Sequence, residues 1–222
     1  MNDIMREYLI KGAELVGNYG FPQLDPIHID AEPCNPVPYS EARHCIVPKK
    51  STLHFFIDDK RFTGIWNDPD KYLALLQNFQ YVCSPDFSIY ADMPAAMQIW
   101  NCYRNRALAY YMQQNGVNII PTAGWSDRKS FQWCLDGLPC NSIIAVSNNG
   151  CLSKQGIYYF EMGLRFMVAT IRPEKILVIG KQPDIDVEVP IIYLDGHSQQ
   201  MQKRLESWNG RKKRIRNTAP EC

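Results

Sequence analysis

Four aspartates stand shortly after apolar runs of this sequence, where a carboxylate could do chemistry. Asp58 and Asp59 follow the run FFI, Asp86 follows YVC, and Asp127 follows VNII. A carboxylate can act as a general acid or base, and several together can hold a divalent metal ion through oxygen. We predict all four as catalytic residues, with Asp59 and Asp86 as candidate metal ligands. The alternative stays open that they only cap helices and form turns.

Hydroxyl, amide, aromatic and basic side chains gather near the same positions. The residues predicted to bind a ligand are Ser84, Ser88, Tyr90, Trp100, Asn101, Arg104, Thr122, Trp125, Ser147, Asn149 and Lys181. Tyr90 and Trp125 could stack on a base, and Arg104 or Lys181 could meet a phosphate. For the Asn101 and Arg104 pair, which lies within an expected helix, an exposed polar face is the other interpretation.

The elements that must position these residues alternate along the chain. Apolar runs predict strands at 53–57, 81–83, 117–120, 142–146, 175–179 and 189–194, and periodic stretches predict helices at 2–18, 68–79, 92–114, 127–135, 156–170 and 198–208. Residues 20–50 are rich in proline and turn formers, so no regular element is expected there.

The later apolar runs, SIIAV, KILVI and PIIYL, are continuous rather than alternating. Such runs are typical of parallel strands that are covered on both faces. We therefore predict an α/β fold of about six parallel strands alternating with helices. An open three-layer sheet is favoured over a partial (β/α) barrel, because a closed barrel normally needs about eight such units. In either case a ligand would bind beyond the carboxyl ends of the strands, where the polar residues above should converge.

Three regions are expected along the chain. Residues 1–50 would form an N-terminal helix and a proline-rich arm packed on the core, 51–208 the α/β domain, and 209–222 a basic tail. The tail contains the block RKKRIR, which could contact phosphates or could simply be a solvated terminus.

Composition excludes several classes of protein. The chain has 222 residues, 45% of them hydrophobic, and a net charge of +1, so bulk charge does not indicate a polyanion-binding protein. No run approaches the roughly twenty apolar residues of a membrane span, and the charged N-terminus is unlike a signal peptide. We expect a cytoplasmic protein with no membrane partner and with its eight cysteines reduced. Neither a G-x-G-x-x-G nor a P-loop motif is present.

Three unbroken strings carry a resemblance to a known family: HFFIDDKRFTGIWNDPDKYL, SPDFSIYADMPAAMQIWNCYRNR and IIPTAGWSDRKSFQWCLDGLP. With the sequence between them and around them, from about Pro36 to about Lys181, the chain resembles an uncharacterised family of bacteriophages and other bacterial mobile elements, known only as a domain of unknown function. The resemblance implies a phage context in a bacterial cytoplasm, where nucleic acids, nucleotides and host defence components are the usual partners. It supplies no catalytic residue and no cofactor.

Two functions of different classes follow. The first is a protein that acts on or binds a nucleotide or nucleic acid through an acidic and aromatic pocket at the carboxyl edge of the strands, with a divalent metal as a candidate cofactor. The alternative is a non-catalytic accessory or counter-defence protein that docks on a host protein or sequesters a ligand. The sequence leaves open whether the protein is an enzyme, and it does not give the oligomeric state.

Overall fold

The computed structural model describes residues 5–151 and 153–217, of which 209–217 are described by backbone alone. Seven parallel strands form two sheets in which the strand order follows the chain. The first sheet contains β3 (Pro36–Pro38), β4 (Thr52–His54), β5 (Tyr81–Cys83) and β6 (Ile119–Ile120); the second contains β7 (Ile143–Val146), β8 (Lys175–Ile179) and β9 (Ile191–Leu194). The parallel α/β architecture is confirmed, but the strands do not form the single six-stranded sheet that was expected.

A short bridge joins the two sheets. Thr122 and Ala145 form an isolated parallel pair, and Ala145 donates to Pro121 O at 2.8 Å while Ala123 donates to Ala145 O at 2.9 Å. The carboxyl ends of β6 and β7 therefore lie side by side. Because of this, the loops that follow β4, β5, β6 and β7 open onto a common edge.

Each strand presents alternate residues to opposite faces, as an extended chain must. One face packs on the helices, through residues such as Leu53, Val82, Ile144 and Val178. The opposite face forms a smaller cluster, which contains Phe56, Tyr81, Cys83, Ile120, Ile143, Ala145, Leu177 and Ile179 and contacts Ile27 and Ile29 of the N-terminal arm. No helical residue of the described chain belongs to this second cluster. The helices thus cover one face, and the arm takes the place of the expected third layer.

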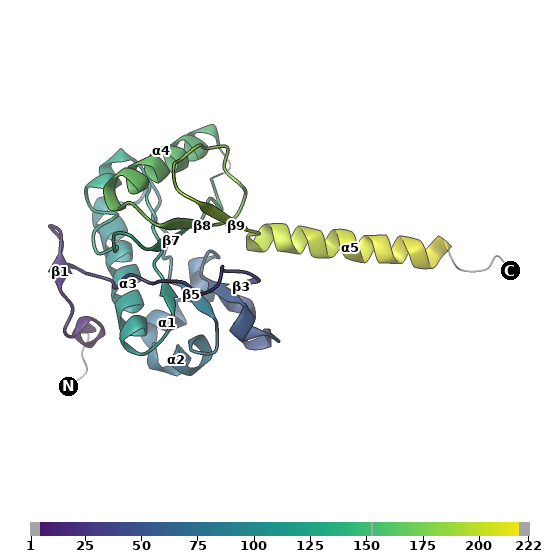
Figure 1. Cartoon of the computed structure of the whole chain (residues 1–222), viewed down its shortest axis with the longest axis horizontal. Helices are drawn as coiled ribbons and strands as arrows, with labels where there is room; N and C mark the ends of the chain where they lie inside the picture. Colours follow the sequence, from purple (N-terminus) through teal and green to yellow (C-terminus); the bar gives the residue numbers. More distant parts are fainter. Residues whose placement is uncertain (1–4, 152, 218–222) are drawn as a thin grey trace.

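In chain order the helices are α1 (Gly64–Asn67), α2 (Asp70–Leu76), α3 (Ala95–Gln114), α4 (Lys154–Ile171) and α5 (His197–Asn217). Helices α1 to α4 form an arc around the strands, and α5 projects away from them (Figure 1). The expected helix at 68–79 is thus the shorter α2, preceded by α1. The helix predicted from residue 92 begins at Ala95, and it stops as expected before Gly116, which has φ 75°.

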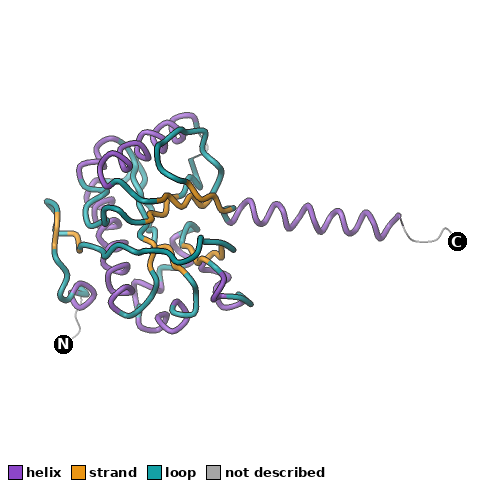
Figure 2. The backbone as a smooth tube through the Cα atoms, in the orientation of Figure 1, coloured by secondary structure: helices purple, strands orange, loops and turns teal. Residues whose placement is uncertain are grey.

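The N-terminal region departs most from the prediction. The expected helix at 2–18 is wrong for the described part: a 3₁₀ turn, η1 (Glu7–Ile10), is followed by β1 (Leu15–Val16), which pairs antiparallel with β2 (Phe21–Pro22). Gly12 and Gly17 have φ of 84° and 71°, and a continuous helix cannot contain such residues. The hairpin and the arm that follows it are visible in Figure 2.

Short 3₁₀ helices occupy several connections: η2 (Tyr39–His44), η3 (Pro48–Lys50), η4 (Asp59–Arg61) and η5 (Arg128–Gln132). The last of these replaces the expected helix at 127–135. The expected strand at 53–57 ends its pairing at His54, because the chain turns where Ile57 donates to Phe55 O at 2.7 Å. That turn directs residues 56–61 towards the shared edge.

α5 is longer than predicted and extends away from the rest of the molecule (Figure 1). Its last residues include part of the predicted basic tail; the side chains from 209 onward lie outside the described residues. None of the helices in the described part of the chain combines the length and the apolar character that a membrane crossing needs.

Candidate functional site

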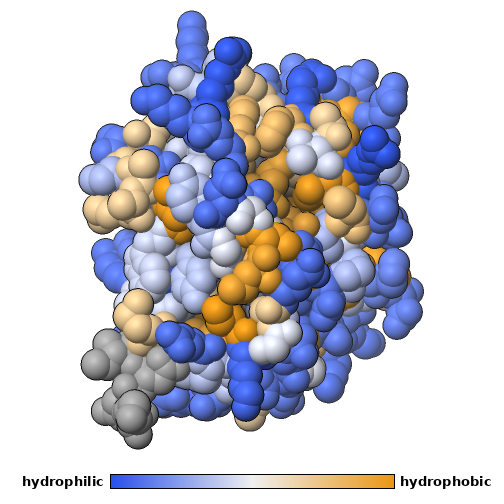
Figure 3. Space-filling view, turned by 90° about the vertical axis from the view of Figure 1, so that its left-hand side faces the viewer, coloured by the Kyte–Doolittle hydropathy of each residue, from blue (hydrophilic) through white to orange (hydrophobic). Residues whose placement is uncertain are grey.

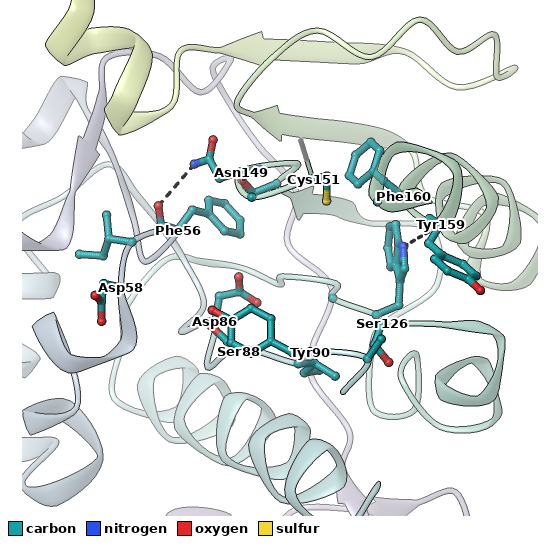
Figure 4. Close-up of a pocket in the computed structure, with 18 of the residues that line it drawn as sticks. Phe56, Asp58, Asp86, Ser88, Tyr90, Ser126, Asn149, Cys151, Tyr159 and Phe160 are labelled. Atoms are coloured by element: carbon teal, nitrogen blue, oxygen red, sulfur yellow. Dashed lines mark hydrogen bonds between the residues drawn. The ribbon is translucent and has the colours of Figure 1, made fainter. Parts of the chain in front are cut away.

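A pocket of about 710 Å³ opens at the carboxyl edge of the strands (Figure 4). Its walls come from the loops after β4, β5, β6 and β7, from the first two turns of α4 and from the start of α5. The lining residues that matter below are Phe56, Asp58, Arg61, Asp86, Ser88, Tyr90, Gly124, Trp125, Ser126, Ser147, Asn149, Cys151, Gln155, Tyr159, Phe160, His197 and Ser198. This is the edge at which the sequence placed the site.

Seven of the residues predicted for the site line this pocket. They are Asp58, Asp86, Ser88, Tyr90, Trp125, Ser147 and Asn149. The other eight lie elsewhere, and their surroundings are given below: Asp59, Ser84, Trp100, Asn101, Arg104, Thr122, Asp127 and Lys181. The strand-end groups therefore converge in part, and the structure distinguishes those that face the cavity from those that support it.

Asp86 is the central polar group of the pocket. Its carboxylate points into the cavity (Figure 4), it lies 3.3 Å from where a Cβ on Gly124 would be, and it accepts no hydrogen bond from a described protein group. Burial raises the pKa of this carboxyl to about 7; the nearby Asp59 carboxylate adds to the increase and the Arg106 guanidinium opposes it. Asp86 can thus exist in both protonation states near neutral pH.

The loop that carries Asp86 is fixed by α3. The Asn105 side chain accepts from Phe87 N at 2.7 Å and donates to Phe87 O at 3.2 Å. One turn earlier, Asn101 donates to Ser88 O at 2.6 Å. Asp59 holds the other side of the loop, because its carboxylate accepts from Ser88 N at 3.1 Å and from Ser88 Oγ at 2.8 Å. These bonds position Asp86, while Asp59, Asn101 and Asn105 do not themselves line the cavity.

In the structure, the predicted polar pair on α3 contacts the 86–88 loop, and neither Asn101 nor Arg104 lines the pocket. Arg104 donates to Asn101 Oδ1 at 2.5 Å, and its guanidinium lies 3.7 Å from the centre of the Phe87 ring. Arg106 is buried and donates to the backbone carbonyls of Thr122, Cys134 and Asp136 at 2.8 to 3.0 Å. Arg104 and Asn101 thus support the 86–88 loop instead of lining the pocket.

The remaining predicted residues form hydrogen bonds within the protein and do not line the pocket. Asp127 caps η5 by accepting from Lys129 N at 2.9 Å, and Ser84 and Thr122 are buried and bond each other across β5 and β6. Lys181 is exposed at the end of β8, where its backbone pairs with the Asn148 side chain.

Asp58 lines the edge of the pocket, but it is engaged with Lys60. Its carboxylate lies 2.9 Å from Lys60 Nζ and accepts from Lys60 N at 3.2 Å. These hydrogen bonds and the charge of Lys60 lower the pKa of Asp58. Figure 4 shows it apart from Asp86. At neutral pH, Asp58 is therefore ionised, while Asp86 is present in both protonation states.

Aromatic rings form much of the wall. Trp125 donates from Nε1 to Tyr159 O at 3.0 Å, and its ring lies 5.8 Å from that of Phe160. The indole fits closely over Gly163, where an added Cβ would lie 2.2 Å from the ring. Phe56 stands on the opposite side of the cavity, and the Asn149 amide donates to Phe56 O at 3.4 Å (Figure 4). A planar ligand could stack in the space between these rings.

Several lining residues were missed from the sequence. Phe56, Cys151, Tyr159, Phe160 and His197 all contribute to the pocket, and Arg61 adds a cation to its described lining. Gln155 and Tyr159 lie on the first turns of α4, which follows β7 in the same way that α3 follows β5. Attention to the first two turns of each helix, and not only to the connecting loops, could have found the residues on α4.

His54 is an unusual buried group beside this site. The residue is fully buried, it stacks 5.8 Å from the Phe56 ring, and neither ring nitrogen has a hydrogen-bond partner in the described chain. Burial lowers the pKa of His54 to about 3, and His197 adds to the decrease. The imidazole is therefore neutral at every pH at which the protein is expected to work.

The residues present do not form an evident metal centre. Within residues 5–151 and 153–217, no three His, Cys, Asp or Glu side chains are grouped so that they could hold a metal ion. Asp59 accepts hydrogen bonds from Ser88, and Asp58 is paired with Lys60 at the edge of the pocket, so neither is grouped with Asp86.

A second groove, of about 730 Å³, lies between the N-terminal hairpin and α3. It is lined by Met5, Glu7, Ile10, Tyr19, Phe21, Ala96, Ile99, Trp100 and Tyr103. Trp100 was predicted to bind the same ligand as Asp86, but it lies in this groove and stacks on Tyr103 at 5.6 Å. Apolar side chains form a band across this face of the molecule (Figure 3).

Comparison with known proteins gives a family without a known activity. Residues 13–195 match DUF4417, a domain of unknown function. The chain is 36% identical over 166 residues to the Gene 1 protein of Mycobacterium phage L5, which covers 73% of this chain and 72% of that protein. It is 37% identical over 130 residues to the Gene 1 protein of Mycobacterium phage D29, which covers 58% of this chain and about half, 48%, of that protein. No solved structure matches the chain.

Proposed function

This chain belongs to the DUF4417 family, which includes mycobacteriophage proteins, and we propose that it binds a nucleobase or nucleotide in the strand-edge pocket with Asp86 as the proton-transferring group. The observation that carries the proposal is the Asp86 carboxyl: it points into an aromatic-walled cavity, has no hydrogen-bond donor from the described protein, and has a pKa of about 7.

The chemistry of Asp86 supports this ligand class. A general acid or base works best when its pKa lies near the working pH, since both forms are then available. The protonated carboxyl can donate to a ring nitrogen while its carbonyl oxygen accepts from an exocyclic amine. The ionised carboxyl can accept from ring and exocyclic N–H groups together. Nucleobases present both of these edges.

The dimensions and walls of the cavity support it as well. Its volume of about 710 Å³ is within the usual range of about 300 to 1,000 Å³ for small-molecule sites. Phe56, Trp125 and Phe160 offer ring faces, and stacking a base on an aromatic side chain contributes about 1 to 3 kcal/mol. In a reaction, ionised Asp86 would accept a proton from a bound N–H or from an attacking water, and the protonated carboxyl would return it in a later step.

The test is ligand-dependent thermal stabilisation. The wild type, Asp86→Asn and Asp92→Asn would be melted with the common nucleosides and their monophosphates, each with and without Mg²⁺ or Mn²⁺. Asp92 is exposed and lies six residues after Asp86 outside the pocket, so its variant controls for loss of one carboxylate. We expect one base to raise the Tm of the wild type and of Asp92→Asn. Asp86→Asn should bind the same base at least about tenfold more weakly than the wild type does. Absence of any shift, or equal binding by Asp86→Asn, would refute the proposal.

A non-catalytic docking protein is the second candidate, and the apolar groove beside α3 favours it. Met5, Tyr19 and Trp100 are each at least two-fifths exposed there, and large exposed apolar surfaces often mark interaction sites. On this alternative, a host protein would co-purify with the wild type and with Asp86→Asn but not with Trp100→Ala. The nucleoside panel would then give no shift.

A further inference from the structure

We propose that the base in the pocket belongs to a nucleic acid strand, whose neighbouring phosphates run along α5. This inference rests on the function proposed for the pocket and specifies its substrate class: a polymer, not a free nucleotide. It follows from where α5 begins, how its base is held, and which charges it carries beyond the body of the protein.

α5 begins at the pocket itself. Its first two residues, His197 and Ser198, are part of the pocket lining. A ligand held between Asp86 and the aromatic walls is therefore at the foot of this helix. Whatever is attached to that ligand and leaves the cavity on this side meets α5 first.

The base of α5 is fixed to the body by polar contacts. Gln200 donates to Pro36 O at 2.7 Å, and Arg204 forms two bonds to the Glu41 carboxylate, at 3.0 and 3.2 Å. Lys203 pairs with Asp195. These contacts hold the helix at a set angle to the pocket, and they use the charges of Lys203 and Arg204 within the protein.

Beyond this anchored part the helix carries only positive charge. After Glu206 the sequence has Arg211, Lys212, Lys213, Arg214 and Arg216, and no acidic residue up to the end of the helix at Asn217. This segment extends away from the rest of the molecule (Figure 1). These five cations are part of 24 Lys and Arg residues that face 23 Asp and Glu residues, so the remainder of the chain has 19 cations against 23 carboxylates and is net negative.

The spacing suits a strand that spans pocket and helix. Residues 211–216 lie 14 to 19 positions after His197, which is about 21 to 29 Å at 1.5 Å per residue. At about 3.4 Å per nucleotide along a strand, this corresponds to roughly six to eight nucleotides. An anionic membrane would also attract the cations, but it presents no base to the pocket at the foot of the same helix.

The experiment is fluorescence anisotropy with labelled single-stranded oligonucleotides of 4, 8 and 16 nucleotides. The wild type would be compared with a triple variant, Lys212→Gln, Lys213→Gln and Arg214→Gln, and with Asp86→Asn. We expect the wild type to bind the 16-mer at least about tenfold more tightly than the 4-mer. The logarithm of its association constant for the 16-mer should fall linearly with the logarithm of the salt concentration, with a slope of up to about −3.5 for five phosphate contacts. The triple variant should lose most of that gain and keep its nucleoside affinity, and Asp86→Asn should weaken the 16-mer as well.

The outcomes separate this inference from the proposed function. If nucleosides bind but the 16-mer binds no more tightly than the 4-mer, the polymer inference is wrong and the pocket proposal stands. If neither nucleosides nor oligonucleotides bind, the pocket proposal fails, and the inference with it. Binding of the 16-mer that needs the cations but is unaffected by Asp86→Asn and by Trp125→Ala would show a separate site, which also contradicts the inference. Cation-dependent binding to phosphatidylglycerol vesicles without oligonucleotide binding would overturn it in favour of a lipid surface.

Discussion

Replacing Asp86 with asparagine should make the protein more stable, and increasingly so as the pH rises. The folded-state pKa of Asp86 is raised to about 7 from its ordinary value of 3.8, mainly because burial disfavours the charged form. Between these two values the folded protein holds a proton that the unfolded chain has released. The contribution of Asp86 to the free energy of unfolding is therefore most favourable below pH 3.8 and is lost progressively as the pH rises towards 7.

The magnitude follows from the size of the pKa shift. A tenfold change in an equilibrium constant corresponds to about 1.4 kcal/mol, so raising the pKa from 3.8 to about 7 costs at most about 4 kcal/mol above pH 7. Between pH 4.5 and 6.5, where the difference in bound protons is largest, the change is about 2 to 3 kcal/mol. Asparagine has the same shape and no charge, so Asp86→Asn removes this pH dependence.

The assay is urea unfolding followed by tryptophan fluorescence at pH 4.5, 5.5, 6.5 and 7.5. The quantity to plot is the free energy of unfolding of the variant minus that of the wild type, in which the unchanged groups cancel. This difference should rise by about 2 to 3 kcal/mol from pH 4.5 to 6.5 for Asp86→Asn. Asp58→Asn is the control, because the pKa of Asp58 is lowered and its difference should stay flat in this window. A flat difference for Asp86→Asn would show that Asp86 is ionised throughout, and would remove the basis for a proton-transfer role.

Three further predictions concern the surroundings of the pocket. His54→Leu should flatten the acid side of the stability profile. The neutral buried imidazole contributes stability above pH 6.5 that is lost as the pH falls towards 3. Urea unfolding should show that about 2 kcal/mol of this wild-type loss, between pH 6.5 and 4.5, is absent from the variant. Gly163→Ala should displace Trp125, lower the free energy of unfolding by about 1 to 3 kcal/mol and shift the fluorescence maximum; an unchanged spectrum would contradict the close approach. Asn105→Ala should cost about 1 to 3 kcal/mol, because it leaves the buried Phe87 N–H without an acceptor, and it should weaken nucleoside binding more than Asn105→Asp does.

The location of the pocket could be predicted because strand direction and side-chain order are local properties. The continuous run SIIAV indicates a parallel strand, and parallel strands in sequential βα units bring their carboxyl ends to one edge. Asp86, Trp125 and Asn149 follow three different strands and line one pocket for that reason. The role of each polar group was less predictable, since helix caps and catalytic carboxylates have the same residue types. Asp127 is a cap and Asp86 is not, and only the fold distinguishes them.

The failures have identifiable physical causes. The spacing of Tyr8, Leu9 and Val16 favoured a helix, but the positive φ of Gly12 and Gly17 breaks the chain into a 3₁₀ turn and a hairpin. Prolines argued against any strand within residues 20–50, yet Pro36–Pro38 forms the edge strand β3, where a missing N–H is tolerated.

The contacts of the polar face of α3 could not be predicted for a different reason. Its partner is the backbone of residues 87 and 88, which lies 13 to 18 positions earlier in the chain. Residue types cannot reveal a backbone partner at that distance, because the backbone offers the same donors and acceptors at every position. An anion and a loop are therefore equally good partners for Asn101 and Arg104 until the fold is known.

Asp86 and His54 should have opposite and additive effects on stability. Asp86 opposes folding as the pH rises from 3.8 to 7, and His54 opposes it as the pH falls from 6.5 to 3, so their contributions between pH 4.5 and 6.5 nearly cancel in the wild type. Neither residue is among the causes of the other's pKa shift, so the two substitutions should combine without coupling. The double variant Asp86→Asn, His54→Leu should therefore return to a flat profile, at a higher free energy of unfolding than the wild type throughout. A double variant that keeps the slope of either single variant would mean that the remaining pH dependence comes from other groups, and that the electrostatic cost assigned to the pocket is misplaced.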